Sequence, residues 1–192
     1  MIDIEFKKKT NKAWLNLVIE NFDEFLVDHA ANERKAAMMA MSMVAHYPDR
    51  ISLAETMIDL ALEELNHFRQ VVKIINQRKL AIPSDSKDPY VGNLRSHFKT
   101  GSKSYLLDRL LCGAIIEARG AERFLMIAEA LPDKKIAKFY LSLAQSEEKH
   151  HRLFLDQATN FFDDTTIKTR LHEWLAIESD IIDLLPTLPR LH

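Results

Sequence analysis

Two short segments of the sequence contain a glutamate followed three residues later by a histidine. They are Glu64-x-x-His67 and Glu147-x-x-His150. On a helix this spacing puts both side chains on one face, about one turn apart. A carboxylate oxygen and an imidazole nitrogen directed at one point can hold a divalent metal ion. One such pair arises easily by chance, so the prediction depends on what accompanies each pair.

Each pair has a second glutamate upstream at nearly the same interval. Glu33 precedes Glu64 by 31 residues, and Glu117 precedes Glu147 by 30. Each of the four segments has a helical stripe that is apolar except at these positions. The order Glu, Glu-x-x-His, Glu, Glu-x-x-His is the ligand set of di-iron and di-manganese carboxylate bundles. The pattern therefore predicts two metal ions held by six side chains, although each residue singly could be an ordinary salt-bridged group.

Charge favours a metal centre over a bare cluster of acids. Four buried carboxylates would repel one another and lose their hydration. Two divalent ions balance four carboxylates when both histidines are neutral, so the whole cluster can lie in an apolar core. Oxygen and nitrogen ligands without a thiolate suit iron or manganese better than a closed zinc site.

Two alternatives compete with this assignment. Glu122 rivals Glu117, but five residues along a helix turn through about 500°, so the two side chains point about 140° apart. The apolar stripe favours Glu117. Glu148 and His151 repeat the last motif one residue further on, beside another apolar stripe. Periodicity slightly favours the earlier register and leaves both open.

Long helices must position these residues. The chain of 192 residues has only 4 Gly and 6 Pro, too few turn residues for a sheet protein of this size. Ser52 with Glu55 is a capping-box pattern, and Asp133 is a further predicted cap. The predicted helices span about residues 10–47, 52–79, 104–131, 133–162 and 166–185.

The links between these helices indicate their connectivity. The first and second helices are joined by a short turn, as are the third and fourth, whereas residues 80–103 are long enough to cross a bundle. The sequence therefore predicts one all-α domain over residues 1–192. It is a ferritin-like four-helix bundle with a long crossover between helices two and three and an extra C-terminal helix.

Composition limits the setting in which the protein works. No segment approaches the roughly 20 uninterrupted apolar residues of a membrane helix, and the N-terminus MIDIEFKKKT lacks the apolar run of a secretory signal. The single cysteine, Cys112, suits a reducing compartment. We expect a cytoplasmic protein. The net charge of −2 argues against an indiscriminate nucleic-acid binder but allows a local basic face.

Four segments resemble the bacterial tRNA hydroxylases of the MiaE type. They are DHAANERK (28–35), LALEELNHF (60–68), GAIIEARGAERF (113–124) and SEEKH (146–150). The resemblance covers about residues 15–160 and includes Asp88-Pro89-Tyr90. The third segment is its most specific part. Where that family usually has Ser-Cys after Glu-Ala-Arg, this chain has Gly120-Ala121.

The resemblance implies a non-haem di-iron monooxygenase. Its substrate would be tRNA carrying 2-methylthio-N6-isopentenyladenosine beside the anticodon, and its reaction would be hydroxylation of the isopentenyl group. Dioxygen would be the co-substrate, with an unidentified reductase or other electron donor. The resemblance favours the earlier register and implies no catalytic residue beyond the metal ligands. Those ligands would be Glu33, Glu64, His67, Glu117, Glu147 and His150.

Residues near the ligands allow two interpretations. Small side chains such as Ala30, Gly113 and Gly120 leave room for an apolar substrate, or they let helices approach closely. The other histidines, including His29, have no partner at ligand spacing and are interpreted as ordinary residues. Basic side chains could form a rim for tRNA phosphates, or each could pair with a nearby acid. This set comprises Arg34, Lys35, Arg95, Lys99, Lys103, Arg119 and Arg123.

Two other functions fit the same ligand set. One is a ferritin-like di-iron or di-manganese oxidase or peroxidase that acts on a small substrate. The other is a ferroxidase. A modified tRNA would require basic side chains beside the metal opening, and a small substrate would not.

Overall fold

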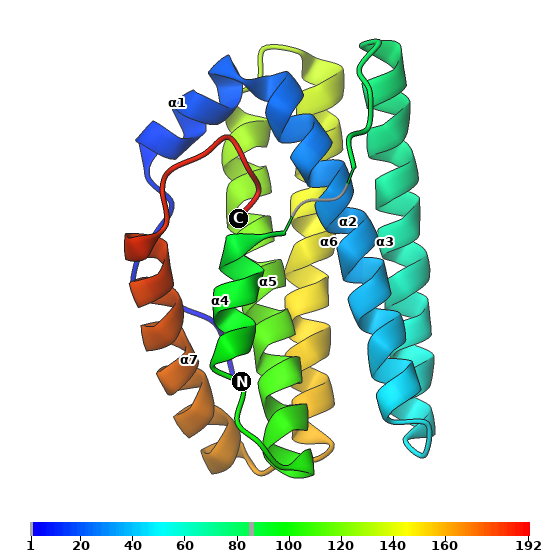
Figure 1. The fold of residues 1–192 in the computed structure, drawn as a ribbon, viewed down its shortest axis with the longest axis vertical. Helices are drawn as coiled ribbons and strands as arrows, with labels where there is room; N and C mark the ends of the chain where they lie inside the picture. Colours follow the sequence, from blue (N-terminus) through cyan, green and yellow to red (C-terminus); the bar gives the residue numbers. More distant parts are fainter. Residues whose placement is uncertain (1, 85–86) are drawn as a thin grey trace. The chain divides into compact units, whose positions relative to one another are not determined.

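The computed structural model describes residues 2–84 and 87–192. Within those ranges the chain is helical and contains no strand, which confirms the prediction of an all-α protein. Figure 1 shows the helices in chain order. They are α1 (Lys12–Glu20), α2 (Phe22–His46), α3 (Ile51–Gln77), α4 (Pro89–Ser96), α5 (Ser102–Ala130), α6 (Lys134–Thr159) and α7 (Asp164–Leu184).

The described residues form two compact units. The α2–α3 unit runs from Glu20 to Ser84 and includes the short segment Pro189–Leu191. The α5–α6 unit contains the N-terminal segment up to Ile19, Lys87–Leu188 and His192. The single domain expected over residues 1–192 stays a prediction.

In the α2–α3 unit, two long helices lie side by side and are joined by a short connection (Figure 1). The predicted first helix is wrong in one respect, because it is broken at Asn21. This residue has φ of −120° and ψ of 41°, outside the helical region. Asparagine favours caps and turns over helix interiors, since its side chain competes for backbone hydrogen bonds.

The predicted cap at Ser52 is also wrong. Helix α3 begins at Ile51, with Arg50 at the N-cap and no capping hydrogen bond from a side chain. The carbonyl of Ser52 accepts a hydrogen bond from the Thr56 hydroxyl at 2.9 Å. Ser52 is therefore already inside the first turn, two residues beyond the observed N-cap.

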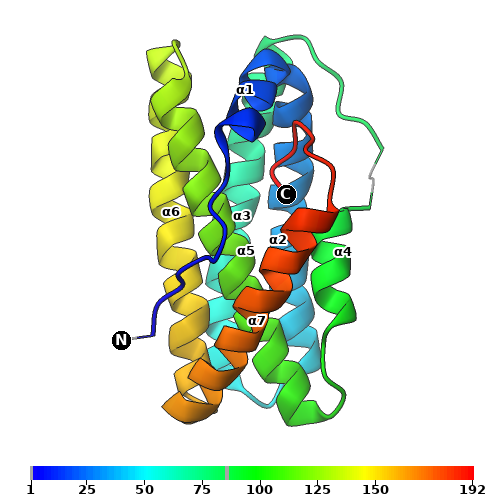
Figure 2. The ribbon, with the colours of Figure 1, turned by 90° about the vertical axis from the view of Figure 1, so that its left-hand side faces the viewer.

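In the α5–α6 unit, α5 and α6 form the second long pair (Figure 1). The Asp133 carboxylate accepts hydrogen bonds from the backbone N–H groups of Lys135 and Ile136, which confirms this predicted cap. Figure 2 shows α7 running beside α4 and α5. Helix α7 is the predicted extra C-terminal helix.

The predicted crossover, residues 80–103, contains a helix that the sequence interpretation missed. The Asp88 carboxylate caps α4 by accepting from the N–H groups of Tyr90 at 2.8 Å and Val91 at 3.2 Å, and Pro89 follows it at the first helical position. An Asp-Pro start is a recognised helix signal. Residues 85 and 86 of the crossover lie outside the described residues.

A buried carboxylate ties α7 and the start of α5 together. The Arg170 guanidinium donates to both oxygens of Asp108, at 2.6 and 2.9 Å, and Trp174 Nε1 donates to one of them at 2.9 Å. The backbone N–H of Lys99 adds a fourth hydrogen bond at 2.6 Å. Asp108 is only 1% exposed, and these donors compensate for its lost hydration.

We predict opposite stability effects for alanine at two glycines of α5. A Cβ atom at Gly113 would lie 2.9 Å from the Phe154 ring, whereas one at Gly120 would lie 3.7 Å from Glu147 Cγ, an ordinary contact. Gly113→Ala should lower the free energy of unfolding by about 1–3 kcal/mol through overpacking. Gly120→Ala should raise it by up to about 1 kcal/mol through helix propensity. Urea unfolding of metal-free protein, followed by helical circular dichroism, measures both, and equal stability of the two variants would contradict the close packing at Gly113.

Candidate metal centre

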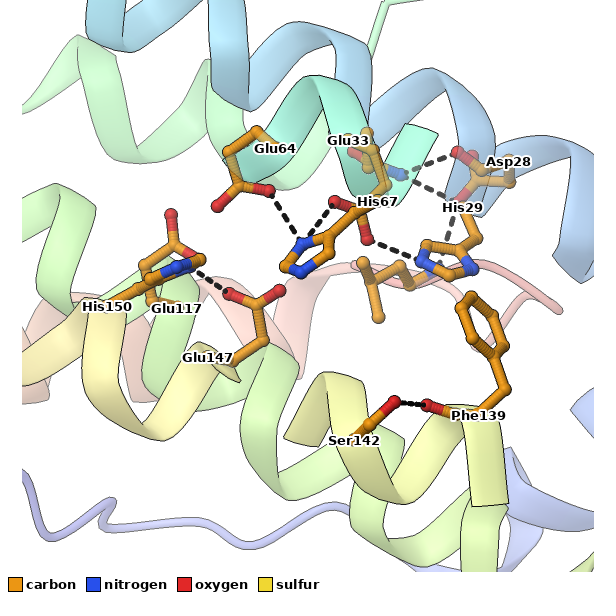
Figure 3. A network of polar contacts seen from close by, with 12 residues as sticks. Asp28, His29, Glu33, Glu64, His67, Glu117, Phe139, Ser142, Glu147 and His150 are labelled. Atoms are coloured by element: carbon orange, nitrogen blue, oxygen red, sulfur yellow. Dashed lines mark hydrogen bonds and ion pairs between the residues drawn. The ribbon is translucent and has the colours of Figure 1, made fainter. Parts of the chain in front are cut away.

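The α2–α3 unit brings together three of the six predicted ligands. Glu33 lies on α2, and Glu64 and His67 lie one turn apart on α3. His67 Nδ1 is 3.5 Å from Glu33 Oε2 and 3.4 Å from Glu64 Oε2 (Figure 3). Ligand atoms of the three residues lie within 4.8 Å of one another, and all three side chains are buried.

His29 is a fourth member of this cluster, and its interpretation as an ordinary histidine is wrong. His29 is completely buried, and its Nε2 lies 2.5 Å from Glu33 Oε1. The sequence signal was present as His-x-x-x-Glu, since residues four apart share a helix face. A search for a glutamate followed by a histidine overlooks this reversed order.

The cluster shifts the ionisation of its members. Burial opposes the charged form of Glu33, but the hydrogen bond and charge of His29, with a further contribution from His67, outweigh it and hold the Glu33 pKa far below its usual range. Burial likewise opposes protonation of His67, but Glu33 and Glu64 outweigh it and raise the His67 pKa to about 10. At neutral pH Glu33 is therefore an anion, the form that a metal ligand requires, and His67 carries a proton that metal binding would release.

The α5–α6 unit brings together the other three predicted ligands. His150 Nδ1 is 3.2 Å from Glu147 Oε2, one turn away on α6, and 3.9 Å from Glu117 Oε2 on α5. Ligand atoms of the three lie within 4.8 Å of one another, and all three residues are buried. Each unit thus contributes two carboxylates and one imidazole to the predicted ligand set, and these balance the charge of one divalent ion when that histidine is neutral.

The competing residues have other partners. Glu148 pairs with Arg152, and its side chain is 46% exposed. His151 is buried, 3.6 Å from Glu148, and burial lowers its pKa. Glu122 accepts hydrogen bonds from Thr10, at 2.7 Å from the hydroxyl. The geometry of this unit therefore favours Glu117, Glu147 and His150 as ligand candidates.

Comparison with known proteins decides the family. The sequence matches the family described as "tRNA-(MS[2]IO[6]A)-hydroxylase (MiaE)" over residues 2–192. The chain belongs to the MiaE family. The resemblance stated from the four sequence segments is therefore confirmed.

Two relatives and one solved structure are similar to this MiaE-family chain. A Pseudomonas putida protein named tRNA 2-(methylsulfanyl)-N(6)-isopentenyladenosine(37) hydroxylase is 33% identical over 173 residues, covering 90% of this chain and 84% of its own. A Salmonella typhimurium protein of the same name is 34% identical over 130 residues, 68% of this chain and 47% of its own. A Synechococcus protein with aldehyde deformylating oxygenase activity matches with a TM-score of 0.93 and 30% identity, covering 98% of this chain and 96% of that one. This likeness in structure supports the predicted ferritin-like fold.

Two of the basic residues predicted for the rim of this MiaE-family protein are buried, so that prediction is wrong for both. Arg119 is 1% exposed and donates to Glu178 Oε1 from Nε at 3.0 Å and from a terminal nitrogen at 2.6 Å. Its guanidinium carbon lies 3.7 Å from the centroid of the Phe6 ring. Arg123 is 7% exposed and lies over the Trp14 ring at 4.7 Å. Partners far away in the sequence bury both arginines.

For the remaining basic residues, a role in a rim that binds tRNA phosphates stays a prediction. Arg95, Lys99 and Lys103 are exposed, and Lys99 Nζ pairs with Glu173 at 3.0 Å. Arg34 and Lys35 are half-buried.

The two glycines of α5 differ in their surroundings. Gly113 packs closely against Phe154, whereas Gly120 borders Glu147 with room for a Cβ atom. In the described ranges, no helix is long and apolar enough to cross a membrane.

The buried ion pair of Arg119 yields a second prediction. Glu178→Leu removes the main partner of a buried guanidinium and should lower the free energy of unfolding by about 3–5 kcal/mol. The double variant Arg119→Met/Glu178→Leu replaces both charges with apolar groups and should recover most of this loss. Denaturant unfolding measures both variants.

A matched control uses an exposed ion pair of the same unit. Lys168 and Asp164 lie one turn apart on α7, with 3.5 Å between Nζ and Oδ2, and their side chains are 59% and 68% exposed. Lys168→Ala should change the free energy of unfolding by less than about 1 kcal/mol. If Glu178→Leu changes the free energy of unfolding no more than this control does, the burial of Arg119 does not depend on its ion pair with Glu178.

Proposed function

We propose that this chain is a non-haem di-iron monooxygenase that hydroxylates the isopentenyl group of 2-methylthio-N6-isopentenyladenosine in tRNA. The family match over residues 2–192 carries the proposal. The P. putida and S. typhimurium relatives are named for a hydroxylase of this modified nucleoside. The two buried sets of glutamates and histidine fit the metal chemistry that such a reaction requires.

In this proposal six side chains hold two iron ions. Glu33, Glu64 and His67 supply one half of the ligand set. Two iron ions supply the reactivity towards dioxygen that protein side chains lack. The other half comprises Glu117, Glu147 and His150.

The protein contributes ligand geometry, charge balance and exclusion of water. Buried carboxylates keep their charge only when cations or hydrogen-bond donors compensate for lost hydration. Helices fix the position of each ligand more closely than loops do, so the reacting carbon can be held near the activated oxygen. In the balanced reaction, one oxygen atom of dioxygen enters a C–H bond of the isopentenyl group and the other leaves as water. An external donor provides two electrons, and two protons are consumed.

Selectivity for tRNA in this proposal comes from cations that are exposed or half-buried. A folded RNA does not fit inside packed helices, so the modified nucleoside must leave its stack to present its apolar tail. Phosphate contacts then depend on Arg34, Lys35, Lys99 and Lys103 rather than on the buried arginines of α5.

A second candidate function is oxidation of a small apolar substrate. The Synechococcus protein of similar structure has aldehyde deformylating oxygenase activity. A small aldehyde would need the same metal ligands but no basic rim. The two candidates therefore differ in their dependence on surface charge and salt.

The test of the proposed function uses reduced, iron-loaded protein with dioxygen and tRNA that carries the methylthio-isopentenyl group. We expect the hydroxylated nucleoside in the digested tRNA, detected by mass spectrometry, and a yield that falls as salt rises because phosphate contacts release counterions. Lys103→Glu should reduce the yield and leave iron binding unchanged.

The control for this experiment is Lys138→Glu, an exposed lysine near the start of α6, at the opposite end of the α5–α6 pair from Lys103. It should leave the yield near that of the wild type. If protein whose iron reacts with dioxygen forms no hydroxylated nucleoside, but converts a small aldehyde, the small-substrate candidate replaces the tRNA hydroxylase.

A further prediction concerns the ligands themselves. Wild-type protein should bind about two iron ions per chain, as the six-ligand set requires. Glu64→Ala, His67→Ala and His150→Ala should each lose stoichiometric binding, whereas His151→Ala should keep most of it. Iron is counted after anaerobic equilibrium dialysis. Loss in His151→Ala together with retention in His150→Ala would move the site to Glu148 and His151.

A further inference from the structure

His29 makes a direct contact with one predicted metal ligand. Its Nε2 lies 2.5 Å from Glu33 Oε1, one helical turn away on α2, and both side chains are buried. An ionised carboxylate can only accept a hydrogen bond, so His29 Nε2–H is the donor. The contact fixes one of the two carboxylate oxygens of Glu33.

The second oxygen of Glu33 has different surroundings. Glu33 Oε2 lies 3.5 Å from His67 Nδ1, and the same nitrogen is 3.4 Å from Glu64 Oε2 (Figure 3). His29 therefore orients Glu33 so that Oε1 stays on the α2 side and Oε2 faces the two predicted ligands of α3. A carboxylate held in this way is prepared to bind a metal through one oxygen.

The surroundings of His29 keep its ring in place. Phe25, also completely buried, packs one turn before it with ring centroids 5.9 Å apart and an interplanar angle of 28°. The neighbouring Asp28 accepts hydrogen bonds from the Asn32 amide, at 3.0 Å, and from the Leu191 backbone N–H, at 2.9 Å. This turn of α2 is therefore braced by its own side chains and by the C-terminal segment.

The other half of the ligand set has a different residue at the position that corresponds to His29. Glu117 corresponds to Glu33 in the repeated pattern, and the residue four positions before it is Gly113. Gly113 has no side chain that could donate to Glu117, and the Phe154 ring packs closely against it. The two halves therefore share their ligand types but differ in the residue one turn before the first glutamate.

We propose that His29 is a positioning residue that holds Glu33 for metal binding in its half of the ligand set. The inference rests on the proposed function, since it assumes that Glu33 is a ligand. Hydrogen-bond partners of metal ligands typically contribute 10–100-fold to metal affinity. Loss of His29 should therefore weaken one of two metal positions and leave the other near its wild-type affinity.

The experiment titrates metal-free protein with Co²⁺ alone and follows bound metal by equilibrium dialysis and visible absorption, without a turnover assay. His29→Leu should weaken one of two bound ions about 10–100-fold. His29→Gln and His29→Asn give a sharper comparison, because the glutamine amide nitrogen reaches the place of Nε2 and the asparagine amide nitrogen only that of Nδ1. Glutamine should restore most of the affinity, and asparagine should not.

The control is His46→Leu, which removes an exposed histidine from the same helix and should leave both ions bound as in the wild type. Circular dichroism of the metal-free proteins identifies any variant that fails to fold. If His29→Leu does not fold, the comparison of glutamine with asparagine decides. If wild type binds two ions and the glutamine and asparagine variants bind them with equal affinity, the positioning role of His29 is overturned and the proposed function is unaffected. A wild-type protein that binds no metal would overturn the proposed function as well.

Discussion

Burial of charge is the constraint on which the rest of this structure depends. An ionised group inside a helical core is stable only when a counter-charge, a metal or several hydrogen bonds replace its water. Asp108 meets this condition with four donors, and Arg119 meets it with Glu178 and Glu122. The Glu33 cluster has two histidines for two carboxylates, and the Glu117 cluster has one. With neutral histidines, the four carboxylates of these clusters carry four negative charges, which two divalent ions would balance.

Most of the features that could be predicted from the sequence follow from local patterns. The long helices follow from apolar stripes of helical period, and the six ligand candidates interrupt those stripes at matching positions. The Asp88-Pro89 signal of α4 was equally local, but it lies in a segment interpreted as a loop because of its turn residues. The first helix is broken at Asn21, whose backbone leaves the helical region, and the apolar periodicity does not report this break.

The features that could not be predicted from the sequence depend on contacts between residues far apart along the chain. Arg119 looks like a surface cation in its own segment, and only Phe6 and Glu178, far away along the chain, make it a core residue. Its charge is therefore matched by Glu178 inside the core and does not face solvent, where a phosphate would bind. Glu178 shows the same limit: it is completely buried, burial raises its pKa, and the Tyr90 hydroxyl lies 3.2 Å from it. None of these pairings has a fixed spacing from which it could be inferred.

The near-repeat in the sequence conceals an asymmetry that matters for chemistry. The ligand types recur in both helix pairs, but position −4 from the first glutamate is a histidine in one pair and a glycine in the other. His29 restrains one oxygen of Glu33, whereas Gly113 gives its space to Phe154. In the proposed di-iron centre, the two halves would therefore share their ligand types and differ at a residue that is not a ligand itself.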